Sequence, residues 1–257
     1  MKMSRVGTLI LRAPGTNCDA ETAFAFQQAG AVTTLVHINQ LIRHEHHLTD
    51  YQIMVVPGGF TYSDDISAGK VLANELKLKL SGDIQRFVEN GGLILGICNG
   101  FQVLVKAGIL PGEGNGEPLL TLSPNDSGRF ECRWVHLEVN RESPCVFTRG
   151  IDRMYLPVAH GEGKIVVTPE ALPRLNVVTR YTDAQGNTNA GYPHNPNGSV
   201  ADIAGICDTS GRIFALMPHP ERHIRGTQHP RWTRQGIKQH GDGLKVFVNA
   251  VRWAQSL

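Results

Sequence analysis

The first hundred residues of the 257-residue chain alternate between strand-like, largely apolar runs and segments with helical periodicity. The strand-like runs are Val6–Leu11, Val32–Ile38, Ile53–Val56 and Leu93–Ile97. Continuous apolar strands are buried on both faces, which is typical of parallel sheets with helices on each side. The helical segments are one capped at Thr16 that runs through Gln28, and Ala68–Leu80 and Ile84–Asn90. Together they predict an α/β fold with a doubly wound, mostly parallel sheet flanked by helices.

The pattern changes after Leu110. A Gly/Pro-rich stretch at Pro111–Pro118 predicts a loop, and Leu244–Ala254 has the periodicity of a closing helix. The strand-like segments of this half are Phe130–Val139, Arg153–Val158, Lys164–Thr168, Val200–Cys207 and Ile213–Met217. The shorter ones predict a small antiparallel extension of the sheet. Because we find no internal repeat and no linker, residues 1–257 are predicted to form a single domain.

The net charge and the number and spacing of the cysteines limit the partners and the cellular compartment that we expect for this chain. The formal net charge is +2, which gives no electrostatic reason to expect a nucleic acid or an anionic membrane as partner. The first apolar run is too short for a signal peptide, and no segment approaches the ~18 apolar residues of a membrane span. The five cysteines are widely spaced and form no Cys-x-x-Cys pair. We therefore expect a soluble cytoplasmic protein without a disulfide scaffold or a zinc ribbon.

The strongest local signal for chemistry is the run Gly96–Gly100 (Gly-Ile-Cys-Asn-Gly), between a buried strand and the helical segment Phe101–Ala107. It matches the nucleophile-elbow pattern, with Cys98 in place of serine. Flanking glycines suit a strained bend that leaves no room for neighbouring Cβ atoms. A thiol at a helix N-terminus is favoured as thiolate. Cys98 is therefore the predicted nucleophile, and the other cysteines are predicted to be small packing residues: Cys18, Cys132, Cys145 and Cys207.

A cysteine nucleophile needs a base, and the base needs an acceptor that orients it. The sequence His219-Pro220-Glu221 offers both within three residues, directly after an apolar strand. Pro218 and Pro220 restrict the backbone on each side of the histidine. We predict a triad of Cys98, His219 and Glu221.

Acyl transfer also needs hydrogen-bond donors for the developing oxyanion. The backbone amide of Asn99, the residue after the nucleophile, is one candidate. The amide of Gly59, at the end of the neighbouring strand, is the second, because a glycine allows close approach to the substrate. Gly58-Gly59 is equally compatible with an ordinary strand-to-loop turn.

These residues resemble the class I (triad) glutamine amidotransferases, through Gly96–Gly100 with Gln102 and through His219-Pro220-Glu221. Further stretches narrow the resemblance to the members that serve a synthase of purine biosynthesis. They are Pro57–Phe60, Asn125–Glu131, His160–Gly163, Asn195–Ser199 and Pro218–Arg222. The resemblance covers nearly the whole chain and implies the flavodoxin-like core of that family.

The resemblance also implies a reaction and partners. It implies hydrolysis of L-glutamine to glutamate and ammonia, with Gln102, His160 and Gly161 binding the substrate. It implies that the ammonia passes to a large synthase subunit, which uses ATP and Mg²⁺ to convert formylglycinamide ribonucleotide to formylglycinamidine ribonucleotide. A small bridging subunit belongs to the same complex. The chain itself is expected to carry no cofactor and no metal.

Two features depart from the family pattern. Ser63 stands where a glycine is usual, and the segment Arg225–Gly243 is longer and richer in charge and histidine. Glycines around the site suggest that Gly58-Gly59, Thr61–Ser67 and His160–Gly163 can move, so we expect the isolated chain to be a poor glutaminase.

Two other functions stay open from the sequence. The chain could be another cysteine-nucleophile hydrolase on the same fold, or a non-catalytic regulatory module.

The run His44–His47 has metal-ligand residue types, but not the i, i+4 spacing of a helical zinc site. Gly69-Lys70 and Gly163-Lys164 lack the other residues of a phosphate-binding loop.

Overall fold

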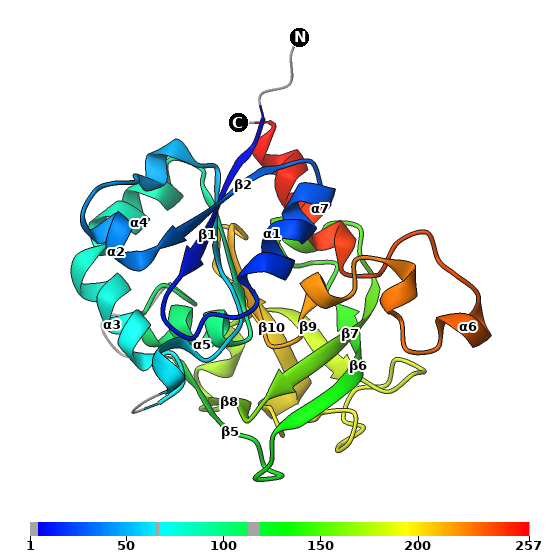
Figure 1. The fold of residues 1–257 in the computed structure, drawn as a ribbon. Coiled ribbons are helices and arrows are strands. Elements are labelled where there is room, and N and C mark those ends of the chain that lie inside the picture. The colour runs from blue at the N-terminus through cyan, green and yellow to red at the C-terminus, as the bar shows by residue number, and fades with distance from the viewer. Residues whose placement is uncertain (1–4, 65–66, 113–118, 257) are drawn as a thin grey trace.

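The computed structural model describes residues 5–64, 67–112 and 119–256 (Figure 1). The helices are α1 (Asp19–Gln28), α2 (Ile38–Ile42), α3 (Lys70–Lys79), α4 (Ser81–Glu89), α5 (Asn99–Lys106), α6 (Trp232–Gln235) and α7 (Leu244–Ala254). The strands of the first half are β1 (Gly7–Arg12), β2 (Val32–His37), β3 (Ile53–Val56), β4 (Leu93–Ile97) and β5 (Leu120–Pro124). Those of the second half are β6 (Glu131–Val139), β7 (Arg153–His160), β8 (Glu162–Val167), β9 (Asn176–Thr182), β10 (Ile203–Cys207) and β11 (Ile213–Leu216). Within these ranges no helix has the length and apolar character needed to cross a membrane.

Most strands join one sheet in the order β2-β1-β3-β4-β11-β10-β9-β6-β7, and β5 pairs with β8 in a separate two-stranded sheet. The strands from β2 to β11 run parallel, whereas β10, β9, β6 and β7 continue the sheet with antiparallel pairings. The predicted fold class, a mostly parallel sheet with an antiparallel extension, is confirmed. Strands β3, β4, β10 and β11 are buried at every position, as expected of strands covered on both faces.

Helices cover the parallel part of the sheet as two separate groups (Figure 1). Helices α1 and α7 pack against each other, and Phe26 meets Phe247 edge to face with ring centroids 5.0 Å apart. Helices α3 and α5 form the other group, and α5 packs on β3 and β4. In the sheet, β2 lies on one side of β1, and β3, which follows β2 in the chain, lies on the other side of β1. The sheet is therefore doubly wound, with its switch point between β1 and β3.

The predicted start of the first helix needs correction. Helix α1 begins at Asp19, after Cys18, and Thr16 does not cap it. The Thr16 hydroxyl instead accepts a hydrogen bond from the Ala13 amide at 3.0 Å, and Thr16 pairs with Gly59 in an isolated bridge. Elements α2, β5, β9 and α6 were not predicted from the sequence, because they are short or carry interspersed polar residues. Residues 113–118 of the predicted loop Pro111–Pro118 lie outside the described part of the chain.

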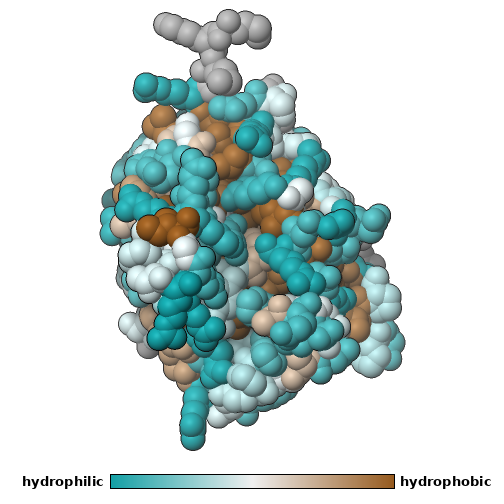
Figure 2. Space-filling model, turned by 90° about the vertical axis from the view of Figure 1, so that its right-hand side faces the viewer, coloured by the Kyte–Doolittle hydropathy of each residue, from teal (hydrophilic) through white to brown (hydrophobic). Residues whose placement is uncertain are grey.

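The unusual segment Arg225–Gly243 is an excursion closed at its base. Arg225 pairs with His240, and the amide of Gly243 donates to the carbonyl of His223 at 2.8 Å. Helix α6 lies at its tip, well away from the sheet (Figure 1). Figure 2 looks onto this side of the molecule and shows a largely hydrophilic surface with apolar patches between the polar groups.

Candidate active site

Four neighbouring parallel strands end at the same edge of the sheet, and a candidate site residue follows each of them. Cys18 follows β1, Gly59 follows β3, Cys98 follows β4 and His219 follows β11. Parallel strands place their carboxyl ends together, and ligands of open α/β sheets bind at this edge, beside the switch point. The sheet order therefore gathers residues from four distant parts of the sequence.

The bend at Cys98 is strained, as the sequence predicts. Cys98 has φ 51° and ψ −106°, which a non-glycine residue rarely adopts. A Cβ atom on Gly100 would lie 1.9 Å from the carbonyl oxygen of Val56 on β3. A Cβ atom on Gly96 would lie 2.7 Å from the Leu104 side chain. Gly100 is thus required for the turn at Cys98 to pack against the sheet, whereas a side chain at Gly96 would need Leu104 to move.

His219 is buried and oriented by Glu221. Its Nδ1 atom lies 2.6 Å from Oε1 of Glu221, and its own backbone amide donates to the carbonyl of Pro157 on β7 at 2.8 Å. Burial alone would lower the pKa of His219, but Glu221 and the nearby thiols of Cys98 and Cys18 raise it well above its usual value. Nε2 of His219 has no hydrogen-bond partner among the described residues. The histidine is therefore held through Nδ1 with Nε2 left to handle a proton.

Cys98, the predicted nucleophile, lies against the antiparallel part of the sheet. The Cys98 thiol is 5% exposed and donates to the carbonyl of Ala159, on edge strand β7, at 3.6 Å. Strand β7 is four places from β11 in the sheet order. The sheet must curl for β7 to reach both Cys98 and His219, and this curl closes the site on its far side.

Both predicted oxyanion donors have amides that are not engaged elsewhere in the described part of the chain. The Asn99 amide lies in the first turn of α5, where helical N–H groups have no intrahelical acceptor. Gly59 has φ 147°, and a Cβ atom there would lie 2.8 Å from the Gly15 carbonyl oxygen and from the Asn17 amide nitrogen. Its neighbour Phe60 donates to the Gly15 carbonyl at 3.0 Å, whereas the Gly59 amide makes no such bond.

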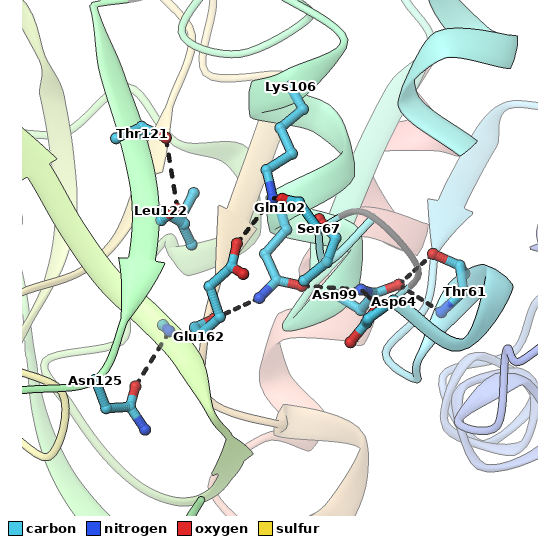
Figure 3. A network of polar contacts seen from close by, with 12 residues as sticks. Thr61, Asp64, Ser67, Asn99, Gln102, Lys106, Thr121, Leu122, Asn125 and Glu162 are labelled. Atoms are coloured by element: carbon cyan, nitrogen blue, oxygen red, sulfur yellow. Dashed lines mark hydrogen bonds and ion pairs between the residues drawn. The ribbon is translucent and has the colours of Figure 1, made fainter. Parts of the chain in front are cut away.

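The Asn99 side chain fastens the loop after β3 to the nucleophile helix (Figure 3). Its Oδ1 accepts hydrogen bonds from the hydroxyl of Thr61 at 2.7 Å and from the Thr61 amide at 3.3 Å. Its Nδ2 donates to Asp64 at 3.2 Å and to Oε1 of Gln102 at 2.8 Å. Asn99 thus couples the position of the Gly59 loop to that of Cys98.

Gln102 and Lys106 extend this network to β8 (Figure 3). The side-chain amide of Gln102 donates to the backbone carbonyl of Glu162, so both ends of that amide are engaged within the protein. Lys106 forms an ion pair with Glu162 at 2.8 Å and donates to Ser67 and Ala68, both at 2.6 Å. The loop after β3, helix α5 and the start of β8 are therefore one connected unit.

His160 lies deep beside the triad. It is 3% exposed, and burial together with nearby His219 lowers its pKa to about 3. Its Nδ1 lies 3.1 Å from Oδ1 of Asn125, an acceptor, so Nδ1 carries the proton of a neutral ring. Nε2 is buried with no hydrogen-bond partner among the described residues. His160 is brought to the site, whereas the adjacent Gly161 is exposed.

The segment His160–Gly163, which the sequence predicts to be mobile, is hydrogen-bonded to Asn125 in the structure. Asn125 holds it through several hydrogen bonds: its Nδ2 donates to the His160 carbonyl at 2.8 Å, its Oδ1 accepts from the Gly163 amide at 3.2 Å, and its own amide donates to the Gly161 carbonyl at 2.9 Å. Asn125 is the first residue of Asn125–Glu131, one of the stretches on which the family resemblance rests, and these hydrogen bonds give a structural reason for an asparagine at this position.

Backbone strain is concentrated in the loop after β3. Tyr62, Ser63 and Asp64 all have positive φ, between 53° and 57°. At Ser63 a glycine would adopt this conformation at less cost, so the family's usual glycine suits the observed bend. Asp65 and Ile66, which complete the predicted loop Thr61–Ser67, lie outside the described residues.

Cys18 was not predicted to belong to the site. It is buried directly beside the triad, where a Cβ atom on Gly58 would lie 3.1 Å from its sulfur and 2.9 Å from Cε1 of His219. Arg222 donates to the Cys18 sulfur at 3.1 Å and pairs with Glu21 at 2.9 Å. Burial raises the pKa of the Cys18 thiol. The only sequence signal for this placement is that Cys18 follows β1, whose carboxyl end lies at the same edge of the sheet as the other site residues.

The chain is similar to known proteins in both sequence and structure. The family model of the CobB/CobQ-like glutamine amidotransferase domain matches residues 5–254. The "Phosphoribosylformylglycinamidine synthase subunit PurQ" of Dehalococcoides mccartyi is 62% identical, over 99% of this chain and 100% of that protein. The protein of the same name from Methanococcus maripaludis is 45% identical, over 95% of this chain and 96% of its own. The solved "Structure of PurLQS from Thermotoga maritima" contains a chain with TM-score 0.74 and 33% identity, covering 97% of this chain and 99% of that one.

Proposed function

Because the chain belongs to the family of CobB/CobQ-like glutamine amidotransferase domains, we propose that it is the glutaminase subunit of a phosphoribosylformylglycinamidine synthase. The observation that carries this proposal is the strained Cys98 elbow, placed beside the buried His219–Glu221 pair. The close relatives with the same subunit name support the choice of pathway, de novo purine biosynthesis.

Thioester formation is the first half of the proposed reaction. The thiolate of Cys98 attacks the side-chain amide carbon of L-glutamine and forms a tetrahedral intermediate. The amides of Gly59 and Asn99 stabilise its oxyanion. His219, oriented by Glu221, gives its proton to the departing nitrogen, the C–N bond breaks, and ammonia leaves.

Hydrolysis of the γ-glutamyl thioester is the second half. Neutral His219 removes a proton from water, the resulting hydroxide attacks the thioester carbon, and the same two amides hold the new oxyanion. The C–S bond then breaks, and glutamate and the Cys98 thiolate are released. In this mechanism His160 stays neutral beside His219, because a second cation there would oppose formation of the imidazolium.

Gln102 has a positioning role in this scheme. Since its amide is engaged with Asn99 and the Glu162 carbonyl, it holds the residues that line the glutamine site. His160 and Gly161, at the turn between β7 and β8, are proposed to contact the substrate.

The proposed partners follow from the same function. We propose that ammonia passes to a large synthase subunit, which carries the ATP and Mg²⁺ that amination needs, with a small bridging subunit in the complex. The similar chain in the solved structure of PurLQS from Thermotoga maritima supports such an assembly. This chain is proposed to carry no cofactor, and we place the complex in the cytoplasm, where the nucleophile stays a reduced thiol.

Partner docking is proposed to complete the site. The loop that holds Gly59 is strained at three consecutive residues, and Asn99 and Lys106 tie it to α5. Phe60 and Phe130 lie beside it, 44% and 52% exposed, with ring centroids 6.3 Å apart. Exposed aromatic side chains of this kind are typical of interface anchors. A subunit that covers them would set the Gly59 amide in place only when ammonia has a destination.

The test is a Cys98→Ala variant in the assembled complex. We expect glutamine-dependent synthesis to be lost and ammonia-dependent synthesis to stay near the wild-type rate, because Cys98 serves only acyl transfer. Cys132→Ala is the matched control, since Cys132 is exposed and should affect neither activity.

Three outcomes would contradict the proposal. Loss of ammonia-dependent synthesis in a correctly assembled Cys98→Ala complex would show that the division of labour is wrong. Hydrolysis of peptides or esters in preference to glutamine would favour another cysteine hydrolase of this fold. A wild-type chain that binds its partner but never hydrolyses glutamine would favour a regulatory module.

A further inference from the structure

Cys18, His219 and Glu221 form a cluster of three potential metal ligands. One donor atom from each residue lies within 4.8 Å of the other two, and all three residues are buried. It is the only such group among the residues that the structure describes. The proposed mechanism uses His219 and Glu221 but gives no role to Cys18.

The cluster has free ligand capacity. Nε2 of His219 and Oε2 of Glu221 are buried and have no hydrogen-bond partner in the described part of the chain. The side chains of His219 and Glu221 are 2% and 0% exposed. Gly58 has no side chain to separate Cys18 from His219, and a Cβ atom there would approach both within 3.1 Å. Two buried donor atoms without a partner therefore belong to the same cluster as the Cys18 sulfur.

The donor set matches zinc. A thiolate, an imidazole and a carboxylate are its usual protein ligands, at bond lengths of about 2.0–2.3 Å in a tetrahedral arrangement. Such bonds place the donor atoms about 3.5 Å apart, so the widest pair needs to close by about 1 Å. The Nδ1–Oε1 pair, 2.6 Å apart, must open unless the ion uses the unpartnered atoms instead.

Charge also balances at this position. The Cys18 thiolate and the Glu221 carboxylate together neutralise a divalent cation. The only other charges directly against the sulfur, among the described residues, belong to Arg222 and its partner Glu21, which form an ion pair with each other. A bound divalent ion therefore adds no net charge to the buried site, which removes the largest cost of placing it there.

We propose that Cys18, His219 and Glu221 form an inhibitory binding site for a thiophilic divalent cation, with Zn²⁺ as the fitting ion. The ion takes one ring nitrogen of His219, and the proton on that nitrogen and the proton of the Cys18 thiol are both released to solvent. With its imidazole bound to metal, His219 no longer transfers protons, and the glutaminase reaction stops. Binding itself stands independently of the proposed function, whereas the inhibition rests on it.

Direct binding is measured first, in the full chain with Cys98→Ala so that the nucleophile cannot serve as a ligand. We expect one Zn²⁺ per chain, measured by competition with a chromophoric chelator, and a thiolate-to-metal absorption band when Co²⁺ replaces Zn²⁺. Loss of an outer-shell partner costs about 10–100-fold in metal affinity, so adding Cys18→Ala, which removes a direct ligand, should cost at least about 100-fold and remove the band.

Matched variants make the test decisive. Adding Cys132→Ala to Cys98→Ala should leave affinity unchanged, because Cys132 is exposed and outside the cluster. Cys18→Ser keeps the size of the side chain and replaces Cys18→Ala if the latter does not fold. Loss of binding in Cys98→Ala alone, or tight binding that survives Cys18→Ser, would overturn the proposal, as would the absence of a stoichiometric ion.

Inhibition is measured second, in the assembled complex with glutamine and with ammonia. Zn²⁺ should suppress the glutamine-dependent reaction only, and Cys18→Ser should raise the concentration for half-inhibition at least about tenfold. Half-inhibition that does not change in Cys18→Ser would show that the ion acts elsewhere. If Zn²⁺ binds as expected but the wild-type chain has no glutaminase activity, the metal site stands and the proposed function fails.

Discussion

Replacing Gly100 by alanine tests the tightest contact of the catalytic turn. The added Cβ atom would lie 1.9 Å from the Val56 carbonyl oxygen and 2.8 Å from its carbonyl carbon. Ordinary contact begins near 3.4 Å, so helix α5 and strand β3 must separate by about 1.5 Å. Both sides of the contact are backbone, and no side-chain rotation can relieve it.

The expected effects are worked from this overlap. In a helix interior, alanine is about 1 kcal/mol more stabilising than glycine. Overpacking a fixed core typically costs about 1–3 kcal/mol, and the cost here lies at or above the upper end of that range. The free energy of unfolding should fall by about 2 kcal/mol. A misplacement of about 1 Å at a catalytic group costs on the order of 10²-fold in rate, so kcat/KM for glutamine should fall at least that far.

Gly82→Ala is the matched control for this substitution. Gly82 also lies within a helix, α4, and no neighbouring atom would come within 4 Å of a Cβ atom added there. The same chemical change should there raise stability by about 0.5–1 kcal/mol and leave the rate unchanged. Stability comes from urea unfolding and activity from glutamine hydrolysis in the complex. Wild-type activity in Gly100→Ala would refute the claim that this contact positions Cys98, whatever its stability.

Three further predictions concern the site. A glutamine-like electrophile should modify Cys98 before exposed Cys132, because binding delivers it to the elbow; mass mapping that finds Cys132 modified first would count against the assignment. The isolated chain should hydrolyse glutamine about 10²–10³-fold more slowly than the complex, the usual worth of one oxyanion donor, and equal rates would exclude gating by the partner. The pKa of His160 in the folded chain is about 3, whereas an unperturbed histidine has a pKa of about 6.5. Below about pH 6.5, only the unfolded chain therefore binds a proton at this residue. Wild type should therefore lose about 1 kcal/mol more stability than His160→Gln between about pH 7.5 and 5.5, and parallel losses would show that His160 titrates normally.

The sequence alone identified most strands of the large sheet and the elbow turn at Cys98, because each is a short run of contiguous residues. Strands β3 and β4 follow from uninterrupted apolar runs, and Gly96–Gly100 specifies a turn that requires Gly100. Strand β9, with polar residues interspersed, was missed, since its burial depends on neighbours that no local pattern records.

The tertiary structure decided which of these pieces meet. Strand β7 touches Cys98 and His219 although it is the edge strand of the sheet, because the sheet curls back over its own strand ends. Cys18 reaches His219 only because β1 ends at the same edge as β11, and its loop packs on a glycine. Contacts between residues two hundred positions apart depend on strand order and sheet curvature, which arise from the packing of the whole core rather than from any one segment.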